Sequence, residues 1–148
     1  MVEILNRHGV RYVVIGGWVA QAYVESYVTE DVDFTPATDP DNLERLSAAL
    51  TELGARIRTE AVPEGLPFAH DAVSLGRTKM WNLQCRHGAF DIALEPAGGG
   101  YDHLASHAHL VNVRGSKSRW RTWPTSLHPR GSRTAQRSSW FCLNWTRL

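Results

Sequence analysis

Two aspartates one residue apart, Asp31 and Asp33, are the strongest chemical signal in the sequence. They fall in a short expected strand, and side chains at positions i and i+2 of a strand leave the same face. Upstream, the glycine pair Gly16-Gly17 closes an apolar run over residues 12–15. Backbone N–H groups at a turn that opens a helix favour phosphate. Two carboxylates beside such a turn have the chemistry to bind Mg²⁺ (or Mn²⁺) together with a nucleoside triphosphate.

A third carboxylate, Asp91, belongs to an expected strand over residues 89–94. Phe90 and Ile92 alternate with it, so they occupy the apolar face of this strand and Asp91 the other. We therefore expect Asp91 to point away from the core and toward Asp31 and Asp33.

This combination resembles the signature of the nucleotidyltransferase superfamily, in which a Gly-Gly pair precedes an Asp-x-Asp strand and a third carboxylate follows on a neighbouring strand. Residues 14–20, 29–34 and 90–92 are most similar to a small bacterial branch of that superfamily. The branch includes the toxins of abortive-infection type toxin–antitoxin pairs and the lincosamide-type antibiotic nucleotidyltransferases. The resemblance covers about residues 3–113.

The resemblance implies an α/β (α+β) fold, with a nucleotidyltransferase-like mixed sheet flanked by helices. It also implies an Mg²⁺-dependent enzyme that transfers a nucleoside monophosphate to the hydroxyl of a tRNA end, a protein or a small molecule, with an antitoxin as a further expected partner. Asp31, Asp33 and Asp91 would bind the metal and catalyse, Asp91 also serving as general base. Nucleotide binding would fall to Gly16, Gly17, Trp18 and Thr29.

Each assignment has a simpler alternative. An Asp-x-Asp pair can cap a helix or face solvent, and a glycine pair is often only a tight turn. Trp18 can pack in the core rather than flank a base, and Thr29 can cap the strand rather than bind phosphate. Arg77 and Lys79 could contact the triphosphate or form a solvated face.

The histidines and cysteines do not form a convincing metal site. His103, His107 and His109 span an expected helix-to-strand junction, so solvated surface histidines are the favoured interpretation. Cys85 and Cys142 are far apart and unpatterned, which is typical of reduced thiols in a cytoplasmic protein.

Helices and strands alternate along the chain, which favours a mixed sheet with helices packed on it. The leucine stripe after Asp39-Pro40 and the glycine at 54 give the clearest helix. Ala55–Arg58 is expected to be an edge strand, and Pro63–Gly76 a loop with a short helix. The other expected helices are 2–8, 18–27 and 101–107, and the other expected strands are 11–15, 32–34, 80–85, 89–94 and 109–113.

Charge divides the chain into two parts. Residues 1–102 contain all 15 acidic residues and eight Lys/Arg, whereas residues 103–148 contain eight Lys/Arg and no acid. We expect one nucleotidyltransferase-like domain over 1–115 and a poorly ordered basic tail over 116–148, rich in Trp, Arg and Ser. Our hypothesis for this tail is a frameshift after Gly115, because no family-like ending is legible in it.

Two other classes of function stay open. Val28 stands where relatives often have a basic residue, and the lysine-bearing C-terminal helix of relatives is missing, so the chain could be a catalytically inactive remnant or a binding module. A basic tail could instead contact nucleic acid. The chain has no run of 18 apolar residues, so no membrane span is expected.

Overall fold

A six-stranded mixed sheet forms the centre of the computed structural model, which describes residues 1–15, 31–108, 120–121 and 142–143. Strands β2 and β6 pair in parallel, and the other neighbours in this sheet pair antiparallel. The expected α/β (α+β) class is confirmed. The strands, in their order across the sheet, are β1 (Tyr12–Ile15), β2 (Val32–Pro36), β6 (Gly88–Ala93), β5 (Met80–Cys85), β3 (Arg56–Thr59) and β4 (Val62–Leu66).

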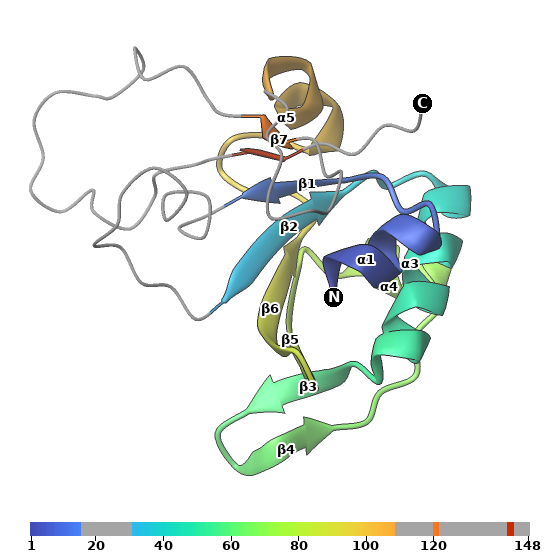
Figure 1. The fold of residues 1–148 in the computed structure, drawn as a ribbon, viewed down its shortest axis with the longest axis vertical. Helices are drawn as coiled ribbons and strands as arrows, with labels where there is room; N and C mark the ends of the chain where they lie inside the picture. The colour runs from blue at the N-terminus through green and yellow to red at the C-terminus, as the bar shows by residue number, and fades with distance from the viewer. Residues whose placement is uncertain (16–30, 109–119, 122–141, 144–148) are drawn as a thin grey trace, which may run out of the picture.

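Helices cover the two faces of the sheet unequally (Figure 1). On one face α1 (Val2–Arg7), α3 (Pro40–Leu53) and α4 (Ala72–Arg77) enclose the main core. On the other face α5 (Tyr101–His107) packs against β1 and the end of β6, in a smaller apolar cluster. The largest fully buried side chains of the main core are Leu5, Phe34, Leu46, Leu50, Leu75, Leu83, Phe90 and Ile92.

The longest of these helices, α3, begins and ends where its sequence predicts. The Asp39 side chain accepts a hydrogen bond from the Asn42 N–H, and Pro40 occupies the first turn. Gly54 follows the last turn in the left-handed conformation, with φ of 61°. The leucine stripe of α3 is buried against the sheet.

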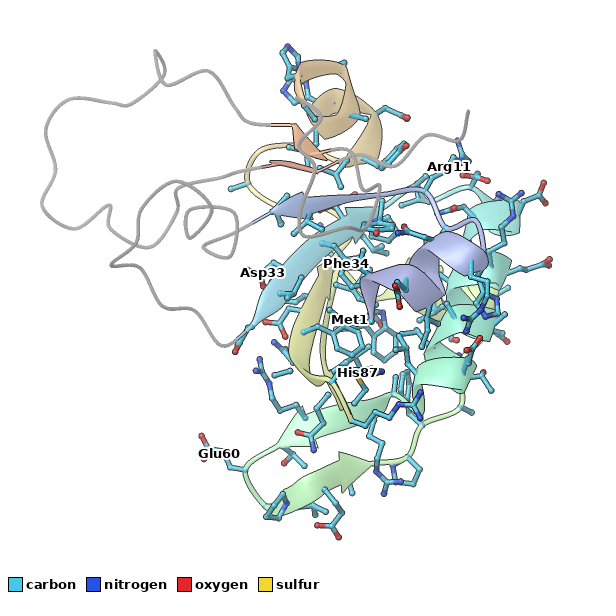
Figure 2. All side chains as sticks on the ribbon, in the orientation of Figure 1. Met1, Arg11, Asp33, Phe34, Glu60 and His87 are labelled. Atoms are coloured by element: carbon cyan, nitrogen blue, oxygen red, sulfur yellow. The ribbon has the colours of Figure 1, made fainter. Side chains whose placement is uncertain are left out.

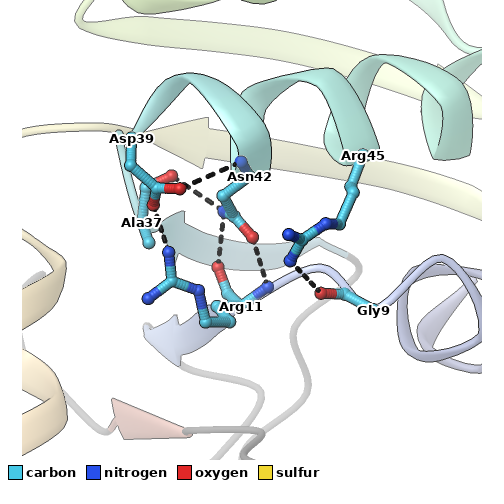
Figure 3. A network of polar contacts seen from close by, with 6 residues as sticks. All are labelled: Gly9, Arg11, Ala37, Asp39, Asn42 and Arg45. Carbon is cyan, nitrogen blue, oxygen red and sulfur yellow. Dashed lines mark hydrogen bonds and ion pairs between the residues drawn. The ribbon is translucent and has the colours of Figure 1, made fainter.

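A polar clasp around the buried Asn42 joins the start of α3 to Arg11, just before β1, and to Ala37, just after β2 (Figure 3). The Asn42 Oδ1 atom accepts a hydrogen bond from the Arg11 N–H at 2.7 Å. Its Nδ2 group donates to the Arg11 and Ala37 carbonyl oxygens at 3.0 and 2.8 Å. The Arg11 guanidinium also pairs with Asp39. Each of these Asn42 hydrogen bonds ties α3 to backbone at the end of a neighbouring strand. The clasp therefore fixes how α3 packs on the sheet.

Two sequence-based expectations were wrong on the far side of the sheet. The strand expected over Ala55–Arg58 is present as β3, but it is not at the edge, because β4 pairs outside β3 and forms the edge itself. Pro63–Gly76 holds this strand as well as the short helix. Pro63 and Gly65 look like turn residues, but an edge strand tolerates a proline without an N–H. Gly65 takes a φ of 76°, which favours glycine.

Several expectations lie outside the described residues. These are the helix over 18–27, the strand over 109–113 and most of the tail over 116–148. Within the tail, the short strands β7 (Trp120–Arg121) and β8 (Cys142–Leu143) pair antiparallel, and β8 lies near β1. No helix within the described ranges is long and apolar enough to cross a membrane.

Candidate functional site

The parallel pairing of β2 and β6 places Asp33 directly opposite Asp91. Residues opposite each other in neighbouring strands point to the same face. Figure 2 shows Asp33 and its neighbour Phe34 on opposite sides of β2, with Phe34 toward the helices of the main core. Asp33 and Asp91 therefore share the face that α1, α3 and α4 leave uncovered.

Asp31 joins them through an arginine on β3. Arg58 donates from Nη1 to Oδ2 of Asp31 at 2.8 Å and from Nη2 to Oδ1 of Asp91 at 3.0 Å. One guanidinium thus bridges two carboxylates that lie 60 positions apart in sequence. The structure brings together all three acidic residues that the sequence singled out.

Further polar residues share this face. Asn82 on β5 lies opposite Asp91, and its side chain hydrogen-bonds the Asp91 carboxylate. Arg56 on β3 lies opposite Gln84 and donates from Nε to the Gly65 carbonyl oxygen at 2.9 Å. Among the described residues, the face on which α5 packs against β1 therefore carries polar side chains from β2 across to β3.

Burial and mutual repulsion raise the pKa of Asp33 to about 6. Loss of solvent is the larger cause, followed by the nearby charges of Asp91 and Asp31, while Arg58 acts in the opposite direction. Burial also raises the pKa of Asp91, against the lowering effects of Arg58 and of the Asn82 hydrogen bond. Carboxylates with such crowding attract a cation.

The donor set fits Mg²⁺ or Mn²⁺, which prefer carboxylate oxygens. As the side chains stand, no three metal-ligating residues of the described ranges converge closely enough to hold an ion. One oxygen of Asp31 and one of Asp91 pair with the Arg58 guanidinium. The metal assignment of Asp31, Asp33 and Asp91 stays a prediction.

The remaining predicted site residues are of two kinds. Gly16, Gly17, Trp18 and Thr29 lie outside the described residues, so their assignment to nucleotide binding also stays a prediction. Lys79, considered above as a triphosphate contact, pairs instead with Glu95 at 2.9 Å on an exposed surface.

The His103 and His107 rings lie one turn apart on α5 in a tilted arrangement, with centroids 4.7 Å apart. His109 lies outside the described residues. This part of the chain supplies no third ligand to form a metal cluster among the residues that the structure describes.

Sequence reasoning assigned no role to Arg58 or Asn82. The signal for both was the alternation of their strands: Arg58 alternates with Ile57, and Asn82 with Leu83, so each is polar opposite an apolar neighbour. That alternation predicts a polar face but not its partners. The pairing of β3 with β5, and of β5 with β6, brings them to the carboxylates.

Comparison with protein-family models, with curated proteins and with solved structures found no match to this chain. The case for a nucleotidyltransferase therefore rests on the residues themselves and on their geometry.

Proposed function

We propose that the protein is an Mg²⁺-dependent nucleotidyltransferase, which transfers a nucleoside monophosphate from a nucleoside triphosphate to an acceptor hydroxyl. The observation that carries this proposal is the register of β2 and β6, which places Asp33 opposite Asp91. Arg58 then links Asp31 to Asp91 by a hydrogen bond to each carboxylate. The resemblance of residues 14–34 to the superfamily signature supports it independently.

In the proposed reaction Asp31 and Asp33 would hold the divalent cations, and Asp91 would complete the set of ligands. Bound Mg²⁺ would lower the pKa of the acceptor hydroxyl and offset charge on the leaving pyrophosphate. The acceptor oxygen attacks the α-phosphorus, the bond to pyrophosphate breaks, and the hydroxyl proton passes to Asp91.

The nucleotide would lie toward the segment that precedes β2. In the proposal the backbone N–H groups around Gly16 and Gly17 hold the phosphates, with Thr29 as a further hydrogen-bond donor and Trp18 beside the base. Positioning and charge neutralisation dominate such reactions, so few other groups are needed.

A second candidate is a catalytically inactive protein of the same fold that only binds nucleotide. The contacts of Arg58 favour it, because an arginine that pairs two of the three carboxylates can replace a metal as their structural counterion. The absence of a legible family ending after Gly115 agrees with it.

The test is transfer of label from each of the four α-³²P-labelled nucleoside triphosphates, with Mg²⁺ or Mn²⁺, to total tRNA, to the protein itself or to a lincosamide-type hydroxyl. We expect Asp31→Asn and Asp33→Asn to lose transfer by roughly 100-fold or more while remaining folded. Glu60→Gln, an exposed acid at the turn between β3 and β4, is the matched control and should keep full activity.

The outcomes separate the two candidates. Metal-dependent nucleotide binding without transfer to any acceptor supports the inactive protein. Full transfer activity in either aspartate variant would refute the assignment of the carboxylates, and the absence of both binding and transfer would refute both candidates.

A further inference from the structure

We propose that Arg58 is the resident counterion of the candidate cation site, so that a divalent cation binds only by displacing its guanidinium from Asp31 and Asp91. This inference rests on the proposed function, because it takes the three carboxylates as the ligands of the cation. The proposal assigns a role to Arg58, which competes with the divalent cation for the carboxylates of Asp31 and Asp91.

The contacts of Arg58 are those of a cation held in place. Each terminal nitrogen meets a different carboxylate, at 2.8 Å for Asp31 and 3.0 Å for Asp91, and both are normal lengths for charge-assisted hydrogen bonds. A guanidinium stays protonated at any ordinary pH, so it cannot vacate the carboxylates by losing a proton. Only movement of the side chain frees the oxygens.

Among the described residues around Arg58, carboxylates outnumber cations. Three carboxylates, Asp31, Asp33 and Asp91, lie near one guanidinium, and the repulsion among them is felt at Asp33. A divalent cation carries twice the charge of Arg58 and is compact enough to be approached by several oxygens. Exchange of the guanidinium for such a cation therefore relieves a charge excess that Arg58 leaves behind.

Because the Arg58 contacts are partly buried, we expect Arg58 to weaken cation binding by a measurable amount. The side chain of Arg58 is 31% exposed and that of Asp91 15% exposed, so their contact is sheltered more than a surface ion pair is. The apparent affinity for a ligand is the intrinsic affinity multiplied by the fraction of molecules in which the site is open. We expect this effect to weaken cation binding by roughly tenfold.

Arg56 provides an internal comparison. It lies two residues before Arg58 on β3, on the same face, but its Nε donates to the Gly65 carbonyl oxygen. Removing either arginine deletes one positive charge from the same strand. Within the described part of the chain, Arg58 pairs with carboxylate oxygens, and Arg56 has no such ion pair.

The experiment measures Mn²⁺ binding to the full-length protein by electron paramagnetic resonance, without nucleotide. We expect Arg58→Gln to bind Mn²⁺ roughly tenfold more tightly than the wild type, and Arg58→Lys to lie between them because it keeps the charge but not the fork. Arg56→Gln should stay within about twofold of the wild type. Equal or weaker binding by Arg58→Gln, or equal gains in both glutamine variants, would overturn the inference.

A second measurement follows Arg58 in the wild-type protein itself and does not compare the metal affinities of variants. The Nε–H resonance of Arg58 in ¹⁵N-labelled wild-type protein, assigned by its absence in Arg58→Lys, should be sharp without metal. It should shift and exchange faster with solvent as diamagnetic Mg²⁺ is added. A signal that Mg²⁺ leaves unchanged, at concentrations where Mn²⁺ binding is complete, contradicts displacement.

The result is distinguishable from failure of the proposed function. Tighter Mn²⁺ binding in Arg58→Gln, with no transfer to any acceptor, supports the competition and rejects only the transferase. If neither the wild type nor Arg58→Gln binds Mn²⁺, the carboxylates are not a cation site, and the inference is rejected too.

Discussion

Asp33 lies near two other carboxylates, Asp31 and Asp91, and its ionisation couples the stability of the fold to pH. Its pKa is about 6 in the folded protein and close to 3.8, the ordinary value, when the chain is unfolded. Between these values the folded state holds more protons than the unfolded state, so the free energy of unfolding falls as pH rises. Well above pH 6 Asp33 is ionised in both states, and its contribution to the free energy of unfolding stays constant at its least favourable value.

Asp33→Asn should remove that pH dependence. We expect the variant to be more stable than the wild type by on the order of 1 kcal/mol at pH 7.5, after allowance for screening by solvent, and to gain nothing at pH 4. Urea denaturation at pH 4, 5, 6 and 7.5 measures this, with Glu60→Gln as the exposed control. A variant that is less stable than the wild type at pH 7.5 would show that Asp33 makes favourable contacts as a carboxylate.

Thr35 offers a second test at the residue scale. Its side chain is fully buried on β2, opposite Val13, and its hydroxyl has no hydrogen-bond partner in the described part of the chain. A buried hydroxyl without a partner loses its hydrogen bonds to water and gains none in the protein. Valine has nearly the same shape and no polar group to desolvate. We expect Thr35→Val to stabilise the protein by about 1 kcal/mol in chemical denaturation.

The matched control keeps the hydroxyl and removes the methyl group. Thr35→Ser should destabilise the protein by about 1 kcal/mol, the usual cost of losing one buried carbon. If Thr35→Val were destabilising, the hydroxyl would have a partner in the folded protein in solution.

At the scale of elements, the clasp of Asn42 decides how α3 meets the sheet. The Asn42 amide is fully buried and joins the Arg11 backbone to Ala37. Asn42→Ala would leave the Arg11 N–H and the Ala37 carbonyl oxygen without these partners, whereas the Arg11 carbonyl oxygen keeps its hydrogen bond from the Ala37 N–H. The variant should cost about 3 kcal/mol in the free energy of unfolding. Thermal and urea unfolding measure the loss.

Arg45→Gln is the comparison on the same helix. Arg45 is exposed and makes one long contact, 3.4 Å, to the Gly9 carbonyl oxygen. We expect a change below about 0.5 kcal/mol. Comparable losses in the two variants would mean that the clasp contributes no more than a surface contact.

At the scale of the whole molecule, the uneven distribution of charge suggests a test of nucleic-acid binding. Every acidic residue lies before position 103, and the 46 residues from 103 onward carry eight Lys/Arg. Replacing Arg130, Arg133 and Arg137 with Gln lowers the formal net charge from +1 to −2, because three positive charges are lost. We expect any binding to tRNA to weaken, with the salt dependence of log K reduced by about 2 to 3.

The control removes the same charge from the domain, by exchanging for Gln the exposed residues Arg7, Arg45 and Arg86. Filter binding between 50 and 300 mM salt, concentrations typical for such measurements, compares the two triple variants. An equal reduction in both would mean that net charge, and not the tail, governs binding. Resequencing the gene tests separately whether a frameshift produced the tail.

Much of the fold and part of the site could be predicted, because they depend on local spacing. The caps of α3, the turn between β5 and β6, and the shared face of Asp31 and Asp33 all follow from residues within a few positions of each other. The strand β4 was missed because Pro63 and Gly65 have turn chemistry. Only a place at the edge of a sheet makes that chemistry compatible with a strand.

The sequence by itself determined which side chains can share a face, since the alternation of a strand is set by its own backbone. Only the tertiary structure decided which faces meet. The parallel register of β2 and β6 sets Asp33 against Asp91, and the pairing of β3 with β5 brings Arg58 between Asp31 and Asp91. Register and strand order depend on how the whole core packs, and no short stretch of sequence contains that information.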